Sequence, residues 1–164
     1  MGCGKSSVGR RLSQLLCCPF MDLDEMIEME SGKAITQIFA EVGEAGFRDM
    51  EKRMLISALS RHNASGETGT VVISLGGGTV TSAECAEIVR STTKCIWLRA
   101  SEDTLTRHLE GEAAQRPMLT GDIRQRIREL MAVRSSIYAS TAHIIIDIDG
   151  KSVDEVAGTI CGLI

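Results

Sequence analysis

Residues 2–7 read GCGKSS, and this stretch decides what kind of fold the rest of the chain has to build. Its GKS matches the second half of the phosphate-binding loop G-x-x-x-x-G-K-[ST], although the first glycine of that pattern would lie before Met1. Apolar residues recur at helical spacing from 7 to 16, so we expect the loop to lead directly into a helix. An anion would then lie at the positive end of the helix dipole. The alternative is a flexible glycine-rich start with a surface lysine.

Composition limits the classes of protein to which the chain can belong. Its 164 residues, 43% of them apolar and 24% charged, are typical of one globular domain. The net charge of -4, the lack of a long basic stripe and the scarcity of aromatic residues argue against a nucleic-acid partner. No stretch approaches the ~18 apolar residues that a membrane span requires, and the start does not resemble a targeting segment. We therefore expect neither a nucleic-acid nor a membrane partner.

The six cysteines are scattered along the chain. They form no C-x-x-C pair, and none lies near a histidine at the spacing of metal ligands. A chain with this many aliphatic residues also needs no disulfides to fold. We expect reduced, buried thiols and a cytoplasmic protein.

Short apolar runs alternate with helical patterns along the chain. Continuous apolar runs at 71–75, 95–98 and 144–146 are typical of strands buried on both faces, and a shorter run lies at 19–21. Strands that alternate with helices of this length predict an α/β fold, with a parallel sheet between two helical layers. The predicted helices span about 7–16, 44–61, 82–90, 102–109 and 152–163.

Acidic residues follow the run at 19–21. Asp22 and Asp24 are expected at alternating strand positions, so both carboxylates would reach one site beyond the strand end. One would serve a Mg²⁺ site and the other a hydroxyl acceptor. The alternative is an acidic helix start with a solvated face, which helix N-termini favour.

Two further groups stand where a ligand of an α/β fold would bind. Gly76, Gly77 and Gly78 directly follow a predicted buried strand and either let a ligand approach the backbone or form a plain tight turn. Arg48, near the start of a predicted helix, is suited to clamp a carboxylate, or else pairs at the surface with Glu44 or Glu51. Both groups stay open to either interpretation at this point.

Residues 110–121, EGEAAQRPMLTG, contain little apolar material to hold them against a core. We expect a mobile lid at about 109–122, whose closure would exclude water from a phosphoryl transfer. The alternative is an ordinary surface loop.

Six segments occur in the order and with the gaps of shikimate kinase. They read GCGKSS, FMDLDEMIE, IFAEVGEAGFRDME, VISLGGG, QRPML and VRSSIYASTA, and together they make essentially the whole chain resemble that family. Gluconate and adenylate kinases share the first segment and not the set. The resemblance implies a P-loop nucleoside monophosphate kinase-like fold over 1–164, with shikimate-binding residues in about 22–61, and ATP and shikimate as substrates.

The resemblance also implies the roles of single residues on the nucleotide side. Lys5 would bind the β- and γ-phosphates of ATP, Ser6 would ligate Mg²⁺, and Asp22 would lie near the metal through water. Arg116 would reach the phosphates from the lid. The implied nucleotide-binding residues are Gly2, Cys3, Gly4, Lys5, Ser6, Ser7, Arg107 and Arg116.

On the acceptor side, the resemblance implies that Asp24 contacts the shikimate hydroxyls and orients or deprotonates the attacking 3-hydroxyl. Lys5, Asp24 and Arg116 would then be the catalytic residues. The implied shikimate-binding residues are Asp24, Arg48, Gly76, Gly77, Gly78 and Arg134.

The start of the chain departs from the family pattern. Family members have a β-strand before G-x-M-G-x-G-K-[ST], and Met1 falls on the internal methionine of that pattern. We expect the first strand, which lies in the middle of the family's sheet, to be absent here, and the start to be internal to a longer natural protein. The alternatives are a non-catalytic binding or interaction domain and a kinase of another small hydroxy acid, such as a gluconate kinase. The resemblance also implies a monomer.

Overall fold

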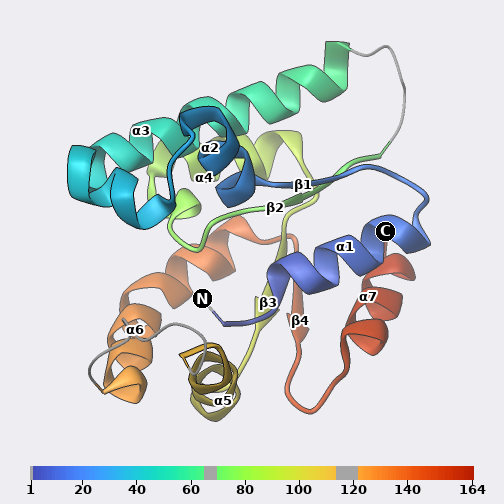
Figure 1. The fold of residues 1–164 in the computed structure, drawn as a ribbon. Coiled ribbons are helices and arrows are strands. Elements are labelled where there is room, and N and C mark those ends of the chain that lie inside the picture. Colours follow the sequence, from blue (N-terminus) through green and yellow to red (C-terminus); the bar gives the residue numbers. More distant parts are fainter. Residues whose placement is uncertain (1, 65–69, 114–121) are drawn as a thin grey trace.

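The computed structural model describes residues 2–64, 70–113 and 122–164, and these form an α/β fold (Figure 1). Parallel strands alternate with helices, as the sequence predicts. The elements are α1 (Lys5–Leu15), β1 (Phe20–Asp22), α2 (Leu23–Ser31), α3 (Ile35–Ala64), β2 (Val72–Ser74), the 3-10 helix η1 (Thr79–Thr81), α4 (Ala83–Thr92), β3 (Ile96–Arg99), α5 (Glu102–Ala113), α6 (Ile123–Thr141), β4 (Ile144–Asp147) and α7 (Val153–Cys161).

The described strands form two separate parallel pairs. β1 pairs with β2, with Phe20 opposite Val72, and β3 pairs with β4, with Ile96 opposite Ile144. In the described part of the chain, β2 and β3 do not pair with each other or with a strand between them. Each of β2 and β3 is therefore paired on one side only in the described residues.

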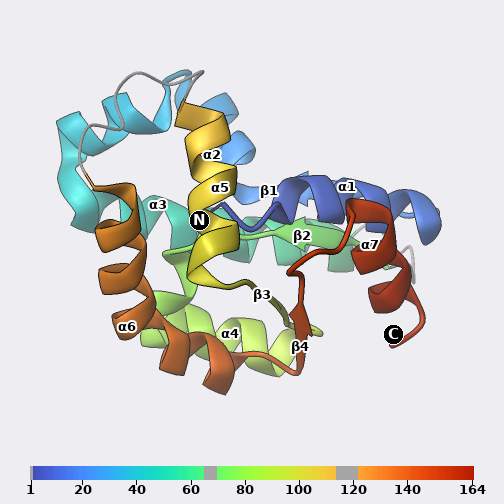
Figure 2. The same cartoon turned by 90° about the horizontal axis from the view of Figure 1, so that it is seen from below.

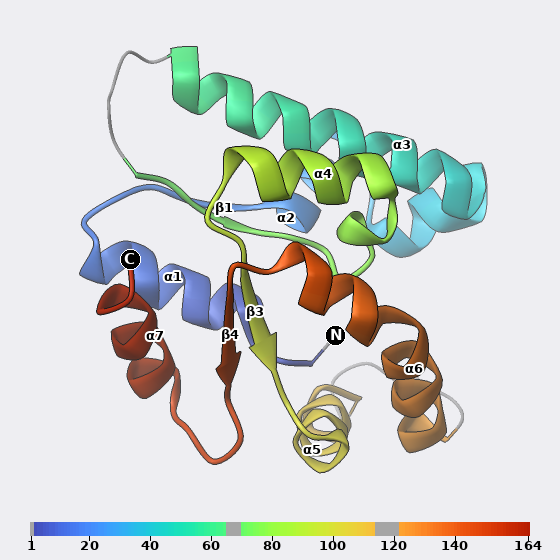
Figure 3. The same ribbon diagram turned by 180° about the vertical axis from the view of Figure 1, so that it is seen from behind.

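Helices cover the strands on both sides. α1 and α7 lie on the side of the strands that faces the viewer in Figure 1. α4 and α6 lie on the opposite side, which faces the viewer in Figure 3. Val8 and Leu12 of α1 pack with Val156 and Ile160 of α7 in one buried cluster. The apolar residues whose spacing predicted these helices therefore form the faces that the helices bury.

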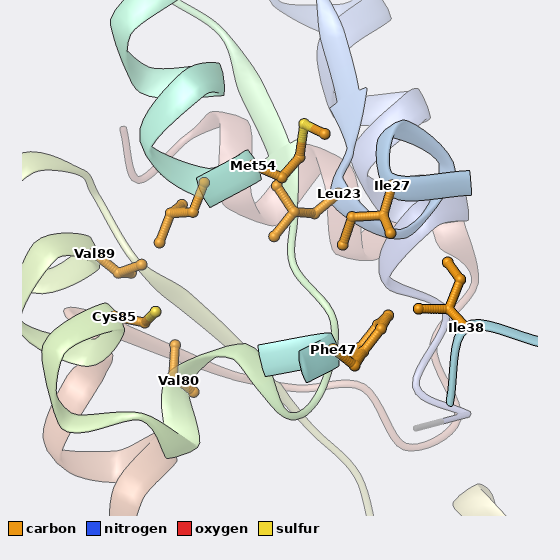
Figure 4. Close-up of a cluster of buried hydrophobic side chains, with 9 residues drawn as sticks. Leu23, Ile27, Ile38, Phe47, Met54, Val80, Cys85 and Val89 are labelled. Atoms are coloured by element: carbon orange, nitrogen blue, oxygen red, sulfur yellow. The ribbon is translucent and has the colours of Figure 1, made fainter. Parts of the chain in front are cut away.

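A second buried cluster joins α2, α3, η1 and α4. Figure 4 shows Leu23 and Ile27 of α2, Phe47 of α3 and Val80 of η1 around one apolar core. Leu23 and Ile27 are fully buried. This core fixes the start of α2, the second part of α3 and the turn after β2 relative to one another.

Two local features differ from the sequence-based expectation. β1 ends at Asp22 and α2 begins at Leu23, so Asp24 lies in the first turn of a helix and not on a strand. The cause is Asp22, whose carboxylate caps α2 by accepting from the N–H groups of Asp24 and Glu25. The helix predicted to start at residue 44 is the second part of α3, after a break at Gly43 with φ 68°.

The cysteines match the expectation in part. All six are free thiols, but only Cys85 is buried; Cys17 is exposed and the other four are partly buried. In the described segments, no cluster of three or more histidine, cysteine or acidic residues is arranged to hold a metal ion. No helix in these segments is both long and apolar enough to cross a membrane.

Candidate active site

The loop before α1 is built to receive an anion. Gly2 and Gly4 have φ of 67° and 70°, a conformation that glycine adopts without strain, and α1 begins immediately afterwards at Lys5. Because glycine at the N-cap has no side chain to accept from the helix, the first N–H groups of α1 can turn to a bound anion. The Lys5 ammonium adds positive charge at the same helix end.

Ser6 and Asp22 join this loop to the end of β1. The Ser6 hydroxyl donates to Asp22 Oδ2 at 2.6 Å, while Asp22 Oδ1 accepts from the backbone N–H of Asp24 at 3.1 Å. Asp22 is buried, so these bonds fix its orientation. A hydroxyl and a carboxylate beside a phosphate site are the oxygen ligands that Mg²⁺ prefers, since this ion completes its shell with phosphates and water.

Asp24 lies half-buried beside the loop. Burial raises the pKa of its carboxyl, the negative charges of Asp22 and Glu51 raise it further, and Lys5 opposes the shift. Its carboxylate also lies against Gly76, where an added Cβ would come within 2.9 Å of Asp24 Oδ1. The side chain therefore faces both the lysine of the loop and the glycines that follow β2.

Arg48 approaches the same glycines from α3. Its guanidinium pairs with the buried carboxylate of Glu51 and, at 3.1 Å, with the exposed carboxylate of Glu44. Burial lowers the pKa of Arg48, but these hydrogen bonds and charges outweigh burial and raise that pKa, so the group stays cationic. The guanidinium also packs against Gly78, at which no side chain would fit.

α6 brings two side chains to the middle glycine. Arg134 Nη1 donates to the Gly77 carbonyl at 3.4 Å, and the Tyr138 hydroxyl donates to the same oxygen. Trp97 of β3 packs beside Tyr138, with ring centroids 5.7 Å apart. Arg134 and Arg48 thus both contact the three-glycine turn, one from α6 and one from α3, and two such cations suit a carboxylate ligand.

A cavity of about 110 Å³ opens between the two strand pairs. Lys5, Gly76 and Gly77 form its polar end. Its remaining walls are mostly apolar side chains from β3, α5 and α6, and Cys3 of the loop also lines it. The cavity therefore extends the candidate site into the space between β3 and the turn after β2.

α5 reaches the loop from the other side, as seen from below in Figure 2. His108 Nδ1 lies 2.7 Å from the Gly2 carbonyl oxygen. Arg107 points elsewhere: it donates to Thr104 at 3.1 Å and lines a second, open cavity of about 700 Å³ between α5 and α6, together with Arg124.

Most of the predicted site residues therefore come together. The loop, Asp22, Asp24, Arg48, the three glycines and Arg134 surround one region, whereas Ser7 is exposed in the first turn of α1. Arg116 and the larger part of the predicted lid lie outside the described residues.

Sequence reasoning named Glu51 only as a possible surface partner of Arg48 and assigned no role to Thr79. Thr79 Oγ1 donates to Glu51 Oε1 at 2.8 Å, and both residues are buried. The spacing of Arg48 and Glu51 signals an ion pair on one helix, but a surface pair has the same spacing. Only the packing of η1 against α3 buries the pair.

Comparison with known proteins identifies the family by sequence. The family described as shikimate kinase matches residues 1–164. The shikimate kinase of Dictyoglomus turgidum is 39% identical over 158 residues, which cover 95% of this chain and 88% of the relative. The shikimate kinase of Persephonella marina is 38% identical over 164 residues, which cover 100% of this chain and 94% of the relative.

Solved structures agree with the sequence relatives. Shikimate kinase from Acinetobacter baumannii, in complex with shikimate, has a TM-score of 0.87 and 30% identity and covers 99% of this chain and 87% of its own. Shikimate kinase from Bacteroides thetaiotaomicron has a TM-score of 0.86 and 31% identity and covers 99% of this chain and 93% of its own. The chain therefore belongs to the shikimate kinase family of ATP-dependent phosphotransferases.

Proposed function

We propose that this chain transfers the γ-phosphoryl group of ATP to the 3-hydroxyl of shikimate, giving shikimate 3-phosphate and ADP. One observation carries the proposal: the anion-binding start of α1, the carboxylate of Asp24 and the cations of Arg48 and Arg134 all face one region. Such a set suits a donor rich in phosphate and an acceptor that carries both hydroxyls and a carboxylate. The whole chain acts as one kinase domain.

On the donor side, the chain's own contribution is alignment and positive charge. Phosphoryl transfer passes through a loose transition state, so the enzyme accelerates it chiefly by holding the γ-phosphate in line and stabilising its charge. The Lys5 ammonium and the N–H groups at the start of α1 would hold the β- and γ-phosphates. Ser6 and Asp22 would hold a Mg²⁺ ion, which would neutralise phosphate charge.

On the acceptor side, Arg48 and Arg134 would bind the shikimate carboxylate and so place the ring beside Asp24. The carboxylate of Asp24 would accept the proton of the 3-hydroxyl. At the same time the oxygen of that hydroxyl would form the new bond to phosphorus, and the bond from phosphorus to the ADP oxygen would break. A raised pKa suits this task, because a carboxylate that holds a proton more firmly is a stronger base.

The remaining parts of the proposal rest on the family resemblance. Arg116 would reach the phosphates from a closing lid, and Arg107 would contact the adenine. We also propose a cytoplasmic monomer that serves the route from shikimate to chorismate and the aromatic amino acids.

The proposal is tested by ADP formation from ATP and Mg²⁺, with and without shikimate. Arg134→Ala should raise the KM for shikimate roughly 10- to 100-fold, since a charge-assisted hydrogen bond contributes about 1.5–3 kcal/mol, and should leave the KM for ATP unchanged. Arg124→Ala is the matched control, because Arg124 lies on the same helix but pairs with Glu102 and Asp103 at the surface. ADP formation that ignores shikimate would contradict the proposal, and gluconate tested in parallel would reveal a different acceptor.

A further inference from the structure

Glu51 is a buried carboxylate whose two oxygens are divided between two partners. Oε2 accepts from Arg48 Nη1, and Oε1 accepts from the Thr79 hydroxyl at 2.8 Å. Glu51 and Thr79 are each only 1% exposed, so water cannot replace either bond. The hydroxyl comes from η1, a different element from the helix that carries the ion pair.

Gly76 packs closely against Oε1 and the hydroxyl. A Cβ at Gly76 would lie 2.6 Å from Glu51 Oε1 and 3.2 Å from Thr79 Oγ1, so this glycine closes the compartment without entering it. If the hydroxyl were removed, Oε1 would be left desolvated and without a donor, which is costly for a charged group. The carboxylate would then gain by turning, and Arg48 would turn with it.

The orientation of Arg48 matters because its donors are shared. Glu51 takes one N–H of Nη1 and Glu44 takes one of Nη2, out of five on the guanidinium. The remaining donors can meet a ligand carboxylate in bidentate fashion only while the guanidinium plane is fixed. Among the described residues, the Thr79 hydroxyl bonds Glu51 and not Arg48, so it would act through Glu51.

We propose that Thr79 is a positioning residue for recognition of the acceptor's carboxylate. Its hydroxyl fixes the orientation of Glu51, and Glu51 fixes the orientation of Arg48. Arg48 then presents its free donors to the ligand. The inference rests on the proposed function for the identity of the ligand and deepens it by one residue. The core in Figure 4 contains Val80 of η1 and Phe47 of α3, which are the sequence neighbours of the two ends of this relay, Thr79 and Arg48.

Binding measurements on three variants test the relay. Titration calorimetry would give the Kd for shikimate and for its methyl ester, which keeps the ring and lacks the carboxylate charge. Thr79→Val, which keeps the shape and removes the hydroxyl, should weaken shikimate binding about tenfold and leave ester binding unchanged. Thr79→Ser should restore wild-type affinity. Thr93→Val, which removes a hydroxyl that bonds only the Val89 carbonyl, is the matched control and should match wild type for both ligands.

A ligand-free measurement keeps the inference separate from the proposed function. NMR of the Arg48 guanidinium should show slow rotation in the wild type and in Thr79→Ser, and faster rotation in Thr79→Val. Equal rotation in all three, or an equal loss of shikimate and ester affinity in Thr79→Val, would overturn the inference. Failure of the wild type to bind shikimate, with slow and hydroxyl-dependent Arg48 rotation retained, would instead overturn the proposed ligand.

Discussion

Asp24 carries a conflict between stability and chemistry. Desolvation is the largest cause of its raised pKa, followed by the charges of Asp22 and Glu51. Because the folded-state pKa lies above the unfolded value, the fold favours the protonated form. The stability linked to this proton is fully present below the usual pKa of an aspartate and is lost as pH rises through the raised value. At neutral pH the charge on Asp24 therefore opposes folding, while catalysis needs that charge.

Asp24→Asn should separate the two effects. At pH 7 we expect a higher Tm than in the wild type, because the variant removes a disfavoured charge, and the difference should vanish at pH values where Asp24 is protonated in both folded and unfolded chains. Turnover should fall by about 10²–10⁴-fold, the usual contribution of a general base. Thermal scans over a pH series and a shikimate-dependent turnover assay measure both. Asp49→Asn, at an exposed site on α3, should change neither, and a Tm for Asp24→Asn below that of the wild type at pH 7 would contradict the account.

At the scale of elements, the turn between β2 and η1 determines the site. Gly76, Gly77 and Gly78 each meet a different partner: the carboxylates of Asp24 and Glu51, the donors of α6, and the Arg48 guanidinium. A side chain in this turn would occupy space that the functional groups of other elements already fill. The sequence left open whether these glycines form a plain turn or admit a ligand; the structure shows that charged groups of other elements pack against the turn, and ligand binding there stays a prediction.

Gly76→Ala and Gly158→Ala should therefore act in opposite directions. The alanine at 76 would meet Glu51 Oε1 at 2.6 Å, so we expect a loss of about 1–3 kcal/mol in the free energy of unfolding and a strong loss of turnover. Gly158 lies inside α7 with nothing within 4 Å, so alanine there should stabilise the protein by up to about 1 kcal/mol and leave turnover unchanged. Urea denaturation and the turnover assay would show both. Equal effects of the two substitutions would mean that the turn is not tightly packed.

Elements were predictable wherever one periodic pattern decides them. The strands β2, β3 and β4 followed from apolar runs, and α1 followed from apolar spacing over 7–16, although it begins two residues earlier, at Lys5. The position of Asp24 did not, because a side chain that caps a helix ended β1 two residues earlier than strand alternation requires. The burial of Glu51 was also hidden, because it depends on η1 packing against α3 across a long stretch of sequence. The role of Arg116 stays a prediction.

At the scale of the whole molecule, the division between the strand pairs is the feature that we expect to lower stability. β2 and β3 each have a partner on one side only in the described part of the chain, and a largely apolar cavity of about 110 Å³ lies between β3 and the turn after β2. Strand edges without partners and unfilled apolar space both lower stability. Cys3 and Lys5 also line this cavity, so motion of its walls would be transmitted to the phosphate-binding loop.

A strand added before Met1 should fill this gap. An extension of about five β-branched residues ending in glycine has the length of an ordinary strand and would pair with both edges. A gain of several kcal/mol would raise the Tm by about 10 °C in a chain of this size. A glycine-serine extension of equal length is the control and should leave the Tm unchanged. Equal Tm values for the two extensions would show that the cavity does not accept a strand.

Identification of the product of ATP and shikimate by ³¹P NMR tests the central claim most directly, with ADP counted in the same sample. We predict one phosphate ester at the 3-hydroxyl of shikimate for each ADP formed, and loss of both products in Lys5→Ala. ADP without a phosphorylated shikimate, or a product that persists in Lys5→Ala, would contradict the assignment of this site to phosphoryl transfer.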